Sequence, residues 1–461
     1  MKVVLPETVL EILNKFGKAG FEIYIVGGAV RDILQKKSVY DWDFTTNAVP
    51  EEMLKIFPKA YYTNEFGTVG IASQKEGERP YEITTFRTEY GYSDFRRPDK
   101  VEWGENLEED LARRDFTINA MALKLEQESE RVKEYKRKTS TLSLIDPFDG
   151  QADLGAKLIR AVGDPNERFS EDALRMMRAI RIAPELGFGI EEKTFDAIKK
   201  NAPLINKIAK ERVKSELLKI LASPNPYQGM LIFRESQLMH EVLPELEKAF
   251  GVEQKSPGRH HIYDVGTHSL MSLKMCKSQD PIVRFATLIH DIGKPQTFKK
   301  QENGVITFYN HEMVSAKIAQ SLAERLRFSN DEKQKLVNLV RWHQFTVDER
   351  QTDSAIRRFI RNVGLENVPD MLALRVADRL GGGARETSWR LEEFKKRLIE
   401  VQKQPFTVAD LKIDGYDVMK ALRLASGPKV GEVLNTLFTE VVEKKLENEK
   451  EALLARLKQL S

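Results

Sequence analysis

The stretch from Tyr24 to Thr46, YIVGGAVRDILQKKSVYDWDFTT, concentrates residue types that bind phosphate and metal ions. A short apolar strand runs into Gly27 and Gly28, and the helix expected next carries Arg31. Glycines let backbone N–H groups approach an anion closely, a helix start adds positive potential, and an arginine grips phosphate oxygens through its forked guanidinium. The pattern predicts a phosphate site, although a purely structural turn would use the same glycines.

Two acids, Asp41 and Asp43, follow soon after and flank Trp42. Residues two apart on a strand point to the same face, so we expect the two carboxylates to lie together. Like charges repel unless a cation separates them, and paired oxygen ligands beside substrate phosphates suit Mg²⁺. Two such ions would activate an attacking hydroxyl and neutralise a leaving pyrophosphate. A solvated strand edge is the alternative, and the preceding Gly-Gly-Arg turn argues against it.

The elements that must position these groups change character along the 461-residue chain. Residues 1 to about 125 mix short β-branched strands with helical patterns, whereas the chain from about 150 onward is almost wholly helical in pattern. The length corresponds to roughly two to four domains. The sequence therefore predicts an α+β protein in which a mixed head precedes an all-α body.

Composition excludes several classes of protein. No apolar stretch approaches the roughly 18 residues of a membrane span, and the N-terminus has the pattern of an amphipathic helix rather than a secretory signal. One cysteine, Cys276, excludes a disulfide framework and a Cys-rich zinc site. We expect a cytoplasmic protein with no membrane partner. The net charge of +3 does not by itself indicate a nucleic-acid partner, although basic residues cluster locally, as in Arg175 to Arg181.

Further motifs follow the opening stretch in a recognisable order. They are YEITTFR (Tyr81 to Arg87), LEEDLARRDFTINAMA (Leu107 to Ala122), DPFDG (Asp146 to Gly150) and RFSEDALRMMRAIRIAPELGF (Arg168 to Phe188). Together with GGAVRD and DWDFTT they resemble the polymerase-β nucleotidyltransferase superfamily in its class II tRNA form, the CCA-adding enzymes and bacterial poly(A) polymerases. The resemblance covers residues 20 to 220 and implies a small mixed-sheet, polymerase-β-like head followed by an all-α neck.

The resemblance also implies a role for individual residues of the head. It places Gly27, Gly28, Arg31 and Arg114 at the nucleotide, gives the catalytic Mg²⁺ ions to Asp41 and Asp43, and makes Glu82 the candidate for a third carboxylate. Asp115 and Asn119 would order the segment near the sugar. A helix cap and a satisfied buried amide are the alternative reading of these two residues.

In the segment EDALRMMRAIR, four charged residues are expected on one helix face: Asp172, Arg175, Arg178 and Arg181. A carboxylate can accept from the exocyclic amine of cytosine or adenine, and an arginine can donate to ring acceptors. In the resembling family, this row binds the nucleotide, and Asp172 with Arg175 selects C or A without a nucleic-acid template. A salt-bridged helix face is the alternative.

The implied reaction is attack by the 3′ hydroxyl of a tRNA on the α-phosphate of CTP or ATP, with release of pyrophosphate. The segment Phe86 to Trp103 looks like a flexible loop that CC-adding enzymes lack, and the basic signature usual in bacterial poly(A) polymerases is absent from Tyr61 to Ser73. These features favour addition of CCA. A tRNA A-adding enzyme and a poly(A) polymerase are the alternatives, and a non-catalytic RNA-binding or HD regulatory protein is an alternative of another class.

Six residues in the helical body form a second recognisable series. They resemble the ligands of an HD-domain metal phosphohydrolase, a mixed nitrogen and oxygen site suited to Mn, Ni, Fe, Co or Mg: His268, His290, Asp291, His311, His343 and Asp378. Some CCA-adding enzymes carry such a domain and show phosphatase or cyclic phosphodiesterase activity on nucleotide or RNA ends. An HD fold retained as a scaffold is the alternative. His240, His260 and His261 fall outside the series.

We therefore expect four domains. A nucleotidyltransferase head would span 1–150, a helical neck for base selection 151–225, an HD-type body 226–385, and a helical tail that contacts tRNA 386–461. ATP and CTP would be substrates, and the oligomeric state is left open.

Overall fold

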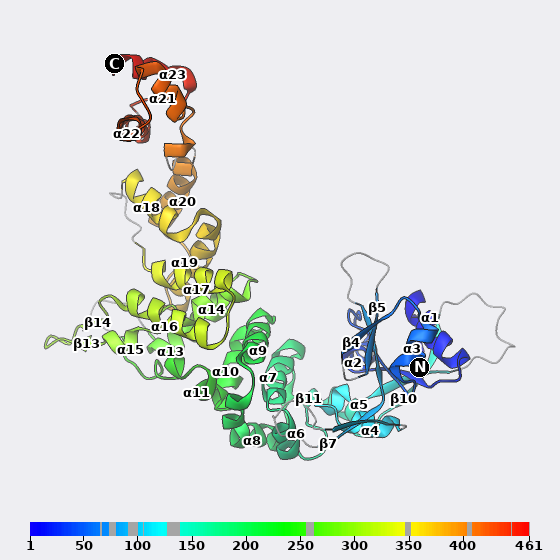
Figure 1. The fold of residues 1–461 in the computed structure, drawn as a ribbon. Coiled ribbons are helices and arrows are strands. Elements are labelled where there is room, and N and C mark those ends of the chain that lie inside the picture. Colours follow the sequence, from blue (N-terminus) through cyan, green and yellow to red (C-terminus); the bar gives the residue numbers. More distant parts are fainter. Residues whose placement is uncertain are drawn as a thin grey trace. The chain divides into compact units, whose positions relative to one another are not determined.

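The computed structural model describes residues 1–64, 67–72, 80–90, 100–104, 106–126, 139–254, 262–345, 352–402, 408–443 and 445–460. The chain forms two compact units, and most of the first is drawn in blue to green in Figure 1. The first unit contains Met1–Lys248 and Glu324–Phe328, and the second contains Ala249–Ala323 and Ser329–Ser461. These two units are coarser than the expected division into four domains, which stays a prediction.

The head is built on one eight-stranded mixed sheet. Its strand order is β1-β10-β9-β2-β3-β6-β5-β4, and the β3–β6 pair is parallel whereas the other pairs are antiparallel. The strands are β1 (Lys2–Val3), β2 (Ile23–Val26), β3 (Asp43–Thr46), β4 (Tyr61–Asn64), β5 (Thr68–Ile71), β6 (Tyr81–Thr85), β9 (Ala122–Leu125) and β10 (Ser140–Ile145). All four residues of β2 are buried, as expected for a central strand with the sequence IYIV.

Short helices and one hairpin complete the head. They are α1 (Glu7–Lys18), α2 (Gly28–Leu34), α3 (Pro50–Ile56), α4 (Leu107–Ala112), the 3₁₀ turn η1 (Thr117–Asn119), and the hairpin of β7 (Arg87–Tyr90) with β8 (Lys100–Trp103). Helix α1 turns its apolar stripe inward, because residues three or four apart share a helix face: Val9, Ile12, Leu13 and Phe16 are buried.

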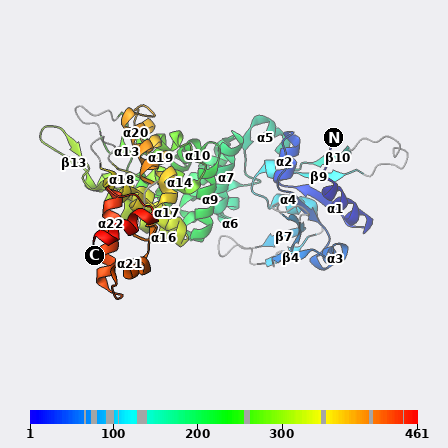
Figure 2. The ribbon, with the colours of Figure 1, turned by 90° about the horizontal axis from the view of Figure 1, so that it is seen from above.

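The rest of the first unit is mainly helical. It contains α5 (Gly150–Ala156), α6 (Pro165–Glu171), α7 (Leu174–Leu186), α8 (Glu192–Asn201), η3 (Ala202–Lys207), α9 (Lys210–Ala222), α10 (Pro226–Glu235), α11 (Leu238–Val242) and α12 (Pro244–Glu247), with a short parallel pair β11 (Leu158–Ile159) and β12 (Gly189–Ile190). Helices α7, α9 and α10 pack against one another (Figure 2). Helices α9 and α10 therefore hold one side of α7 in place.

The second unit is a helical array followed by a small tail. The array contains α13 (Val265–Met275), α14 (Pro281–Ile289), α15 (Lys294–Thr297), α16 (His311–Arg325), α17 (Asn330–Trp342), α18 (Asp353–Val363), η4 (Leu365–Asn367), α19 (Val368–Gly381) and α20 (Trp389–Gln402), with the strand pair β13 (Lys299–Lys300) and β14 (Ile306–Thr307). Helix α13 packs against α14 and α19, and α14 packs against α17.

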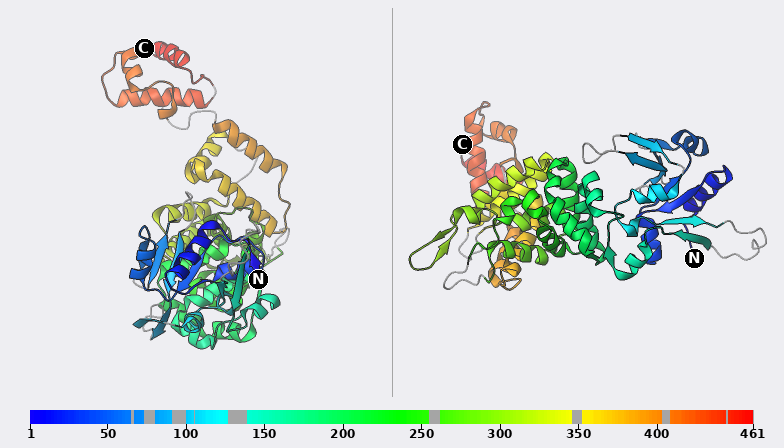
Figure 3. Two further views of the ribbon diagram at one scale, coloured as in Figure 1. Left: turned by 90° about the vertical axis from the view of Figure 1, so that its right-hand side faces the viewer. Right: turned by 90° about the horizontal axis from the view of Figure 1, so that it is seen from below.

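The tail, drawn in orange to red in Figure 3, has an apolar core of its own. It consists of η5 (Val408–Asp410), α21 (Gly415–Leu422), α22 (Pro428–Val442) and α23 (Lys450–Gln459), and its most buried residues are Val418, Leu437, Leu453 and Leu457. Such a core indicates that the tail packs as a module.

The expected fold class is confirmed: a mixed-sheet head precedes a helical remainder, in which only two short strand pairs occur among the described residues. None of the helices described is both long and apolar enough to cross a membrane. The centre of the expected loop Phe86 to Trp103, the signature region's Glu65, Phe66 and Ser73, and His260 and His261 lie outside the described residues.

Candidate functional site

Two of the three acids of the head, Asp43 and Glu82, lie side by side on neighbouring strands. Strand β3 begins at Asp43, and its parallel partner β6 places Glu82 beside it in register. Burial together with the negative charges of Asp41 and Glu82 raises the pKa of Asp43 to about 6, against the opposing effect of Arg114 and Arg178. Because Asp41 lies before the first residue of β3, strand alternation alone does not set the direction of its side chain.

Gly27 lies where the expected phosphate and metal groups meet. Its φ of 70° falls in the left-handed region that favours glycine. A Cβ atom at Gly27 would lie 3.3 Å from Asp43 Oδ2 and 3.4 Å from Arg114 Nη1. Gly28 begins α2, which is only seven residues long. We therefore expect the guanidinium groups, rather than the terminus of this short helix, to contact the phosphates.

A chain of polar contacts connects Arg31 with the neck. Arg31 Nη1 donates to Asn119 Oδ1 at 3.0 Å, Asn119 Nδ2 donates to Asp115 Oδ1 at 3.3 Å, and Arg178 Nε donates to Asp115 Oδ2 at 2.7 Å. Burial alone would raise the pKa of Asp115, but the charge and hydrogen bond of Arg178 together with the hydrogen bond from Asn119 lower it. Asp115 also accepts a hydrogen bond from the N–H of Phe116. The same contacts therefore order the segment from Asp115 to Asn119 and supply hydrogen-bond partners for the buried Asp115 and Asn119 side chains.

The expectation that Asp172 shares a helix face with Arg175 is wrong. Helix α7 begins at Leu174, and Asp172 lies in the turn that follows α6 with extended backbone angles. Its carboxylate accepts the N–H of Leu174 at 3.0 Å and pairs with Arg212 Nη2 on α9 at 2.8 Å. A short acidic side chain that bonds nearby backbone N–H groups favours a cap over a helix interior, which explains the break.

The three arginines of α7 have separate partners. Arg175 Nη2 donates to the carbonyl oxygen of Arg113 at 3.0 Å, Arg178 pairs with Asp115 at 2.6 Å, and Arg181 Nε pairs with Glu216 on α9 at 2.8 Å. Arg175 and Arg178 therefore turn toward the head segment, whereas Arg181 turns toward α9.

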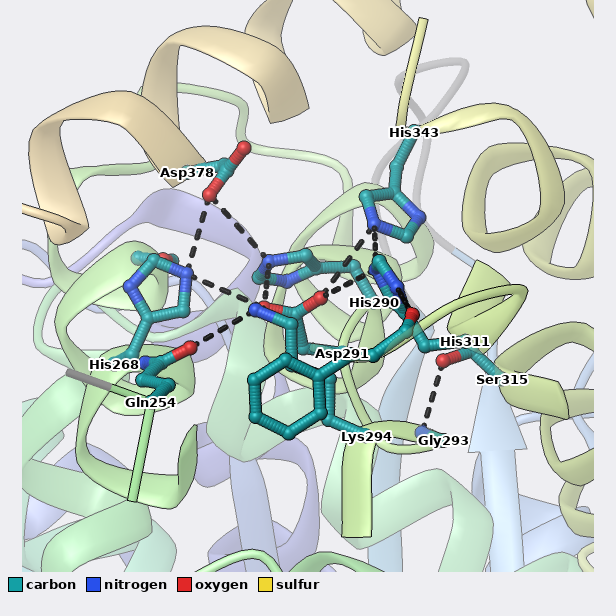
Figure 4. A network of polar contacts seen from close by, with 12 residues as sticks. Gln254, His268, His290, Asp291, Gly293, Lys294, His311, Ser315, His343 and Asp378 are labelled. Atoms are coloured by element: carbon teal, nitrogen blue, oxygen red, sulfur yellow. Dashed lines mark hydrogen bonds and ion pairs between the residues drawn. The ribbon is translucent and has the colours of Figure 1, made fainter. Parts of the chain in front are cut away.

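All six residues of the second series lie in one cluster, drawn in Figure 4. His268 comes from α13, His290 and Asp291 follow α14, His311 begins α16, His343 follows α17, and Asp378 comes from α19. Five of them are buried and Asp378 is partly buried.

The carboxylate of Asp291 lies at the centre of this cluster. Its Oδ2 is 3.2 Å from His290 Nε2 and 3.6 Å from His268 Nε2, whereas its Oδ1 is 3.2 Å from His311 Nε2 and 3.5 Å from His343 Nε2. Asp378 Oδ1 lies 3.1 Å from His268 Nε2. One carboxylate thus faces two pairs of imidazoles through different oxygens.

Backbone carbonyl groups fix the orientation of three of the rings. His290 Nδ1 lies 2.7 Å from the carbonyl oxygen of Thr287, and the corresponding distances are 2.8 Å for His311 with Phe308 and 2.7 Å for His343 with Val340. A proton on Nδ1 leaves Nε2 as an acceptor that faces the centre. His311 Nε2 and His343 Nε2 are 3.3 Å apart. When both rings are neutral, their nitrogen lone pairs lie close enough for one metal cation to bind both.

The electrostatics of the cluster also favour a cation. Burial alone would lower the pKa of His290, but the charges of Asp291 and Asp378 raise it to about 10. Burial lowers the pKa of His343, and His290 with Lys294 holds the pKa of Asp291 well below its usual range against the effect of burial. The raised pKa of His290 means that the two carboxylates favour a positive charge at the position that suits a divalent ion.

Some polar residues at these sites were not predicted from the sequence. Lys294 Nζ lies 2.6 Å from Asp291 Oδ2 and donates to Gln254 Oε1 at 2.9 Å, and Arg212 pairs with Asp172. Lys294 follows Asp291 by three residues across a short turn, and this spacing is a signal that the sequence offered. Gln254 and Arg212 do not belong to any of the sequence motifs described above.

Three family models match the chain. Residues 23–160 match the poly A polymerase head domain, residues 187–250 match the "Probable RNA and SrmB- binding site of polymerase A", and residues 296–457 match tRNA nucleotidyltransferase domain 2. The three models match the same linear order of parts that the motifs indicate.

Full-length relatives are also similar. The CCA-adding enzyme of Ligilactobacillus salivarius is 36% identical over 98% of this chain and 96% of its own, and that of Enterococcus faecalis is 33% identical over 96% and 93%. Among solved structures, the CCA-adding enzyme of Bacillus stearothermophilus in complex with CTP has a TM-score of 0.68 and 29% identity over 98% of this chain and 96% of its own. The Thermotoga maritima CCA-adding enzyme complexed with tRNA, at 19% identity over 99% and 97% and a TM-score of 0.58, shares the fold.

Proposed function

This chain belongs to the family of CCA-adding enzymes, and from that premise we propose that its head adds C, C and A to the 3′ end of tRNA. CTP and ATP are the nucleotide substrates. The 3′ hydroxyl attacks the α-phosphate, the bond to the β-phosphate breaks, and pyrophosphate leaves. The observation that supports this proposal most is the meeting of Gly27, Asp43 and Arg114 at one point of the head, with Asp41 and Glu82 adding negative charge.

The residues of the head fit divalent cations. Asp41 and Asp43 would hold two Mg²⁺ ions, and Glu82 is the third candidate ligand, because a hard cation stabilises clustered carboxylates, and the pKa of Asp43 is raised by its neighbours and by burial. Bound there, Mg²⁺ would activate the hydroxyl and neutralise the leaving pyrophosphate. Arg31 and Arg114 would orient the triphosphate through their guanidinium groups, and Gly27 keeps the space between Asp43 and Arg114 free of a side chain.

The neck residues would read the base. Asp172 and Arg175 offer one acceptor and one set of donors beside the start of α7, Arg178 adds a guanidinium on the side of the head segment, and Arg181 would act from its position against Glu216 of α9. Arg212 holds the Asp172 carboxylate at 2.8 Å and so acts as a positioning residue for base selection. Selection by protein groups explains how the base can change from C to A without a nucleic-acid template.

The second unit supports a second activity, hydrolysis of a phosphate ester at an RNA or nucleotide end. His268, His290, Asp291, His311, His343 and Asp378 would hold a divalent metal, which would supply an activated water. In the balanced step, the water oxygen bonds to phosphorus, the bond from phosphorus to the sugar oxygen breaks, and that oxygen takes up the proton. The products are inorganic phosphate and the free hydroxyl that nucleotide addition requires.

Substitution of Asp41 tests the assignment of the head. We expect Asp41→Ala to reduce incorporation of labelled CMP and AMP into tRNA by about a thousandfold, because the metal loses a ligand, with tRNA binding largely retained. Glu51→Ala, at an exposed position of α3, is the matched control and should keep full activity. Incorporation by Asp41→Ala at the rate of the unaltered protein would refute the metal assignment.

A further inference from the structure

A pocket of about 1090 Å³ opens in the second unit beside the histidine and aspartate cluster. It is formed by the end of α19, the turn after it and the start of α20, and its lining includes Arg379, Gly382, Arg385 and Trp389. A Cβ atom at Gly382 would lie 3.7 Å from His268 Cε1, and Arg379 directly follows the cluster residue Asp378. The pocket therefore adjoins the cluster that we assign to a metal.

The lining combines an exposed ring with positive charge. Trp389 is 63% exposed, and the Nε of Arg379 is buried with no hydrogen-bond partner among the described residues. The two glutamates of the lining are neutralised by lysines, since Glu386 pairs with Lys277 at 2.6 Å and Glu392 pairs with Lys395 at 2.9 Å. The charge that remains for a ligand comes from the arginines.

An aromatic ring next to guanidinium groups is the chemistry that binds nucleotides. Every nucleic-acid base can stack on an aromatic side chain, and arginine donates hydrogen bonds to phosphate oxygens. The guanidinium of Arg390 already lies over the Trp389 ring, 5.2 Å from its centre, and the ring still contributes to the pocket lining. A simple phosphate would leave the exposed ring of Trp389 without a function.

We propose that this pocket binds the terminal nucleoside of a phosphate ester whose phosphate faces the metal cluster. Trp389 stacks on the base, and Arg379 holds the phosphate beside Asp378 and His268. Trp389 and Arg379 would thus be the residues that select an ester carrying a nucleoside, either a free nucleotide or an RNA 3′ end, over a small phosphate ester without a base. The role in hydrolysis rests on the proposed phosphohydrolase activity, whereas the binding of the nucleoside does not require turnover.

A binding measurement on the full-length protein loaded with Mn²⁺ tests the pocket. Adenosine 3′-phosphorothioate and inorganic thiophosphate serve as probes in calorimetric titrations, because the sulfur slows hydrolysis. We expect Trp389→Ala to weaken binding of the nucleoside probe about tenfold, the loss typical of one stacked base, and to leave thiophosphate binding unchanged. Trp389→Phe should restore most of the affinity.

Two further variants sharpen this test. Arg379→Gln should weaken binding of both probes, because it removes a phosphate contact. Ile399→Ala alters a residue that is 62% exposed on the same helix as Trp389 but away from the pocket, and it should change neither affinity. Equal affinity of the nucleoside probe for the unaltered protein and Trp389→Ala, or no binding of it at all, would overturn the proposal.

Hydrolysis separates this proposal from the proposed phosphohydrolase activity and distinguishes the two ligand sources. With Mn²⁺ supplied, kcat/KM is compared for adenosine 3′-phosphate, a short RNA with a 3′-phosphate, and p-nitrophenyl phosphate. Trp389→Ala should lower kcat/KM about tenfold for the nucleoside substrates only, and the more affected one identifies the source. Absence of hydrolysis of every substrate would refute the phosphohydrolase activity, while the binding experiment alone decides the pocket.

Discussion

Asp43 combines partial burial with two neighbouring negative charges, and these raise its pKa to about 6. The unfolded carboxyl ionises near its ordinary pKa of about 3.9, so the folded protein binds the additional proton between these values. The free energy of unfolding of the metal-free protein should therefore fall as pH rises from about 4 to about 6. Above that range the charged carboxylate destabilises the head, and bound Mg²⁺ would relieve the penalty.

We therefore expect Asp43→Asn to raise the unfolding free energy of the metal-free protein by about 2 kcal/mol at pH 7 while it removes nucleotide incorporation. Urea unfolding at pH 7 and pH 4.5 measures the effect, which should shrink at the lower pH. Mg²⁺ should stabilise the unaltered protein and not the variant. A variant less stable than the unaltered protein at pH 7 would contradict this account of the charge cluster.

Asp172 is the residue at which base selection can be tested. We expect Asp172→Asn to reduce the selectivity between CTP and ATP by at least about tenfold, because an amide no longer offers two equivalent acceptors to the exocyclic amine of the base. The ratio of kcat/KM for CTP and ATP on a tRNA ending in CC measures selectivity. Asp196→Asn, an exposed change on α8, should leave the ratio unaltered, and an unaltered ratio in Asp172→Asn would defeat the template hypothesis.

Residue types were easier to predict from the sequence than their partners. The motifs pointed to Asp43, Gly27 and Arg114, which the fold does bring together, and to the six residues of the second cluster. The contacts of Arg212 with Asp172 and of Gln254 with Lys294 each join residues 40 positions apart along the chain, so no local spacing could predict them. Only packing decides which side chains meet across such separations.

At the scale of secondary structure, the start of α7 is where sequence reasoning and structure differ. The periodicity of EDALRMMRAIR fits one continuous helix, but the Asp172 carboxylate accepts the N–H of Leu174, the first residue of α7, and lies outside the helix. Helix ends depend on capping competition that periodicity does not detect. The strand order of the head sheet could likewise not be predicted from local pattern, because β2 pairs on one side with β3, which follows it closely, and on the other with β9, which comes much later in the chain.

The ion pair of Asp115 with Arg178 joins the η1 segment to helix α7. We expect Asp115→Ala to lower the free energy of unfolding by about 2 kcal/mol, since charged hydrogen bonds are lost, while the half-exposed Arg178 regains water. The midpoint of urea unfolding measures stability, and the KM for CTP should rise as Arg31 and Asn119 lose their order. Unchanged stability together with unchanged KM would mean that this chain of contacts is incidental.

For the whole molecule, the two compact units divide the proposed chemistry between them. We expect the double substitution His290→Ala and Asp291→Ala to remove Mn²⁺-dependent phosphohydrolase activity and to leave CCA addition within about twofold, because the head acids belong to the other unit. Both activities are measured on the same preparation. Loss of both in a folded variant would show that the units are functionally coupled.

The most direct test of the account incubates the full-length protein and Mg²⁺ with three tRNAs, which end at the discriminator base, at C and at CC. CTP and ATP are supplied separately and together, and product lengths are read on a sequencing gel. We predict that the shortest tRNA gains two nucleotides with CTP alone and three with both, that the tRNA ending in CC gains one with ATP, and that growth then stops. Addition of A to the CC end alone, or an adenosine tail that continues to grow, would contradict CCA addition by this protein.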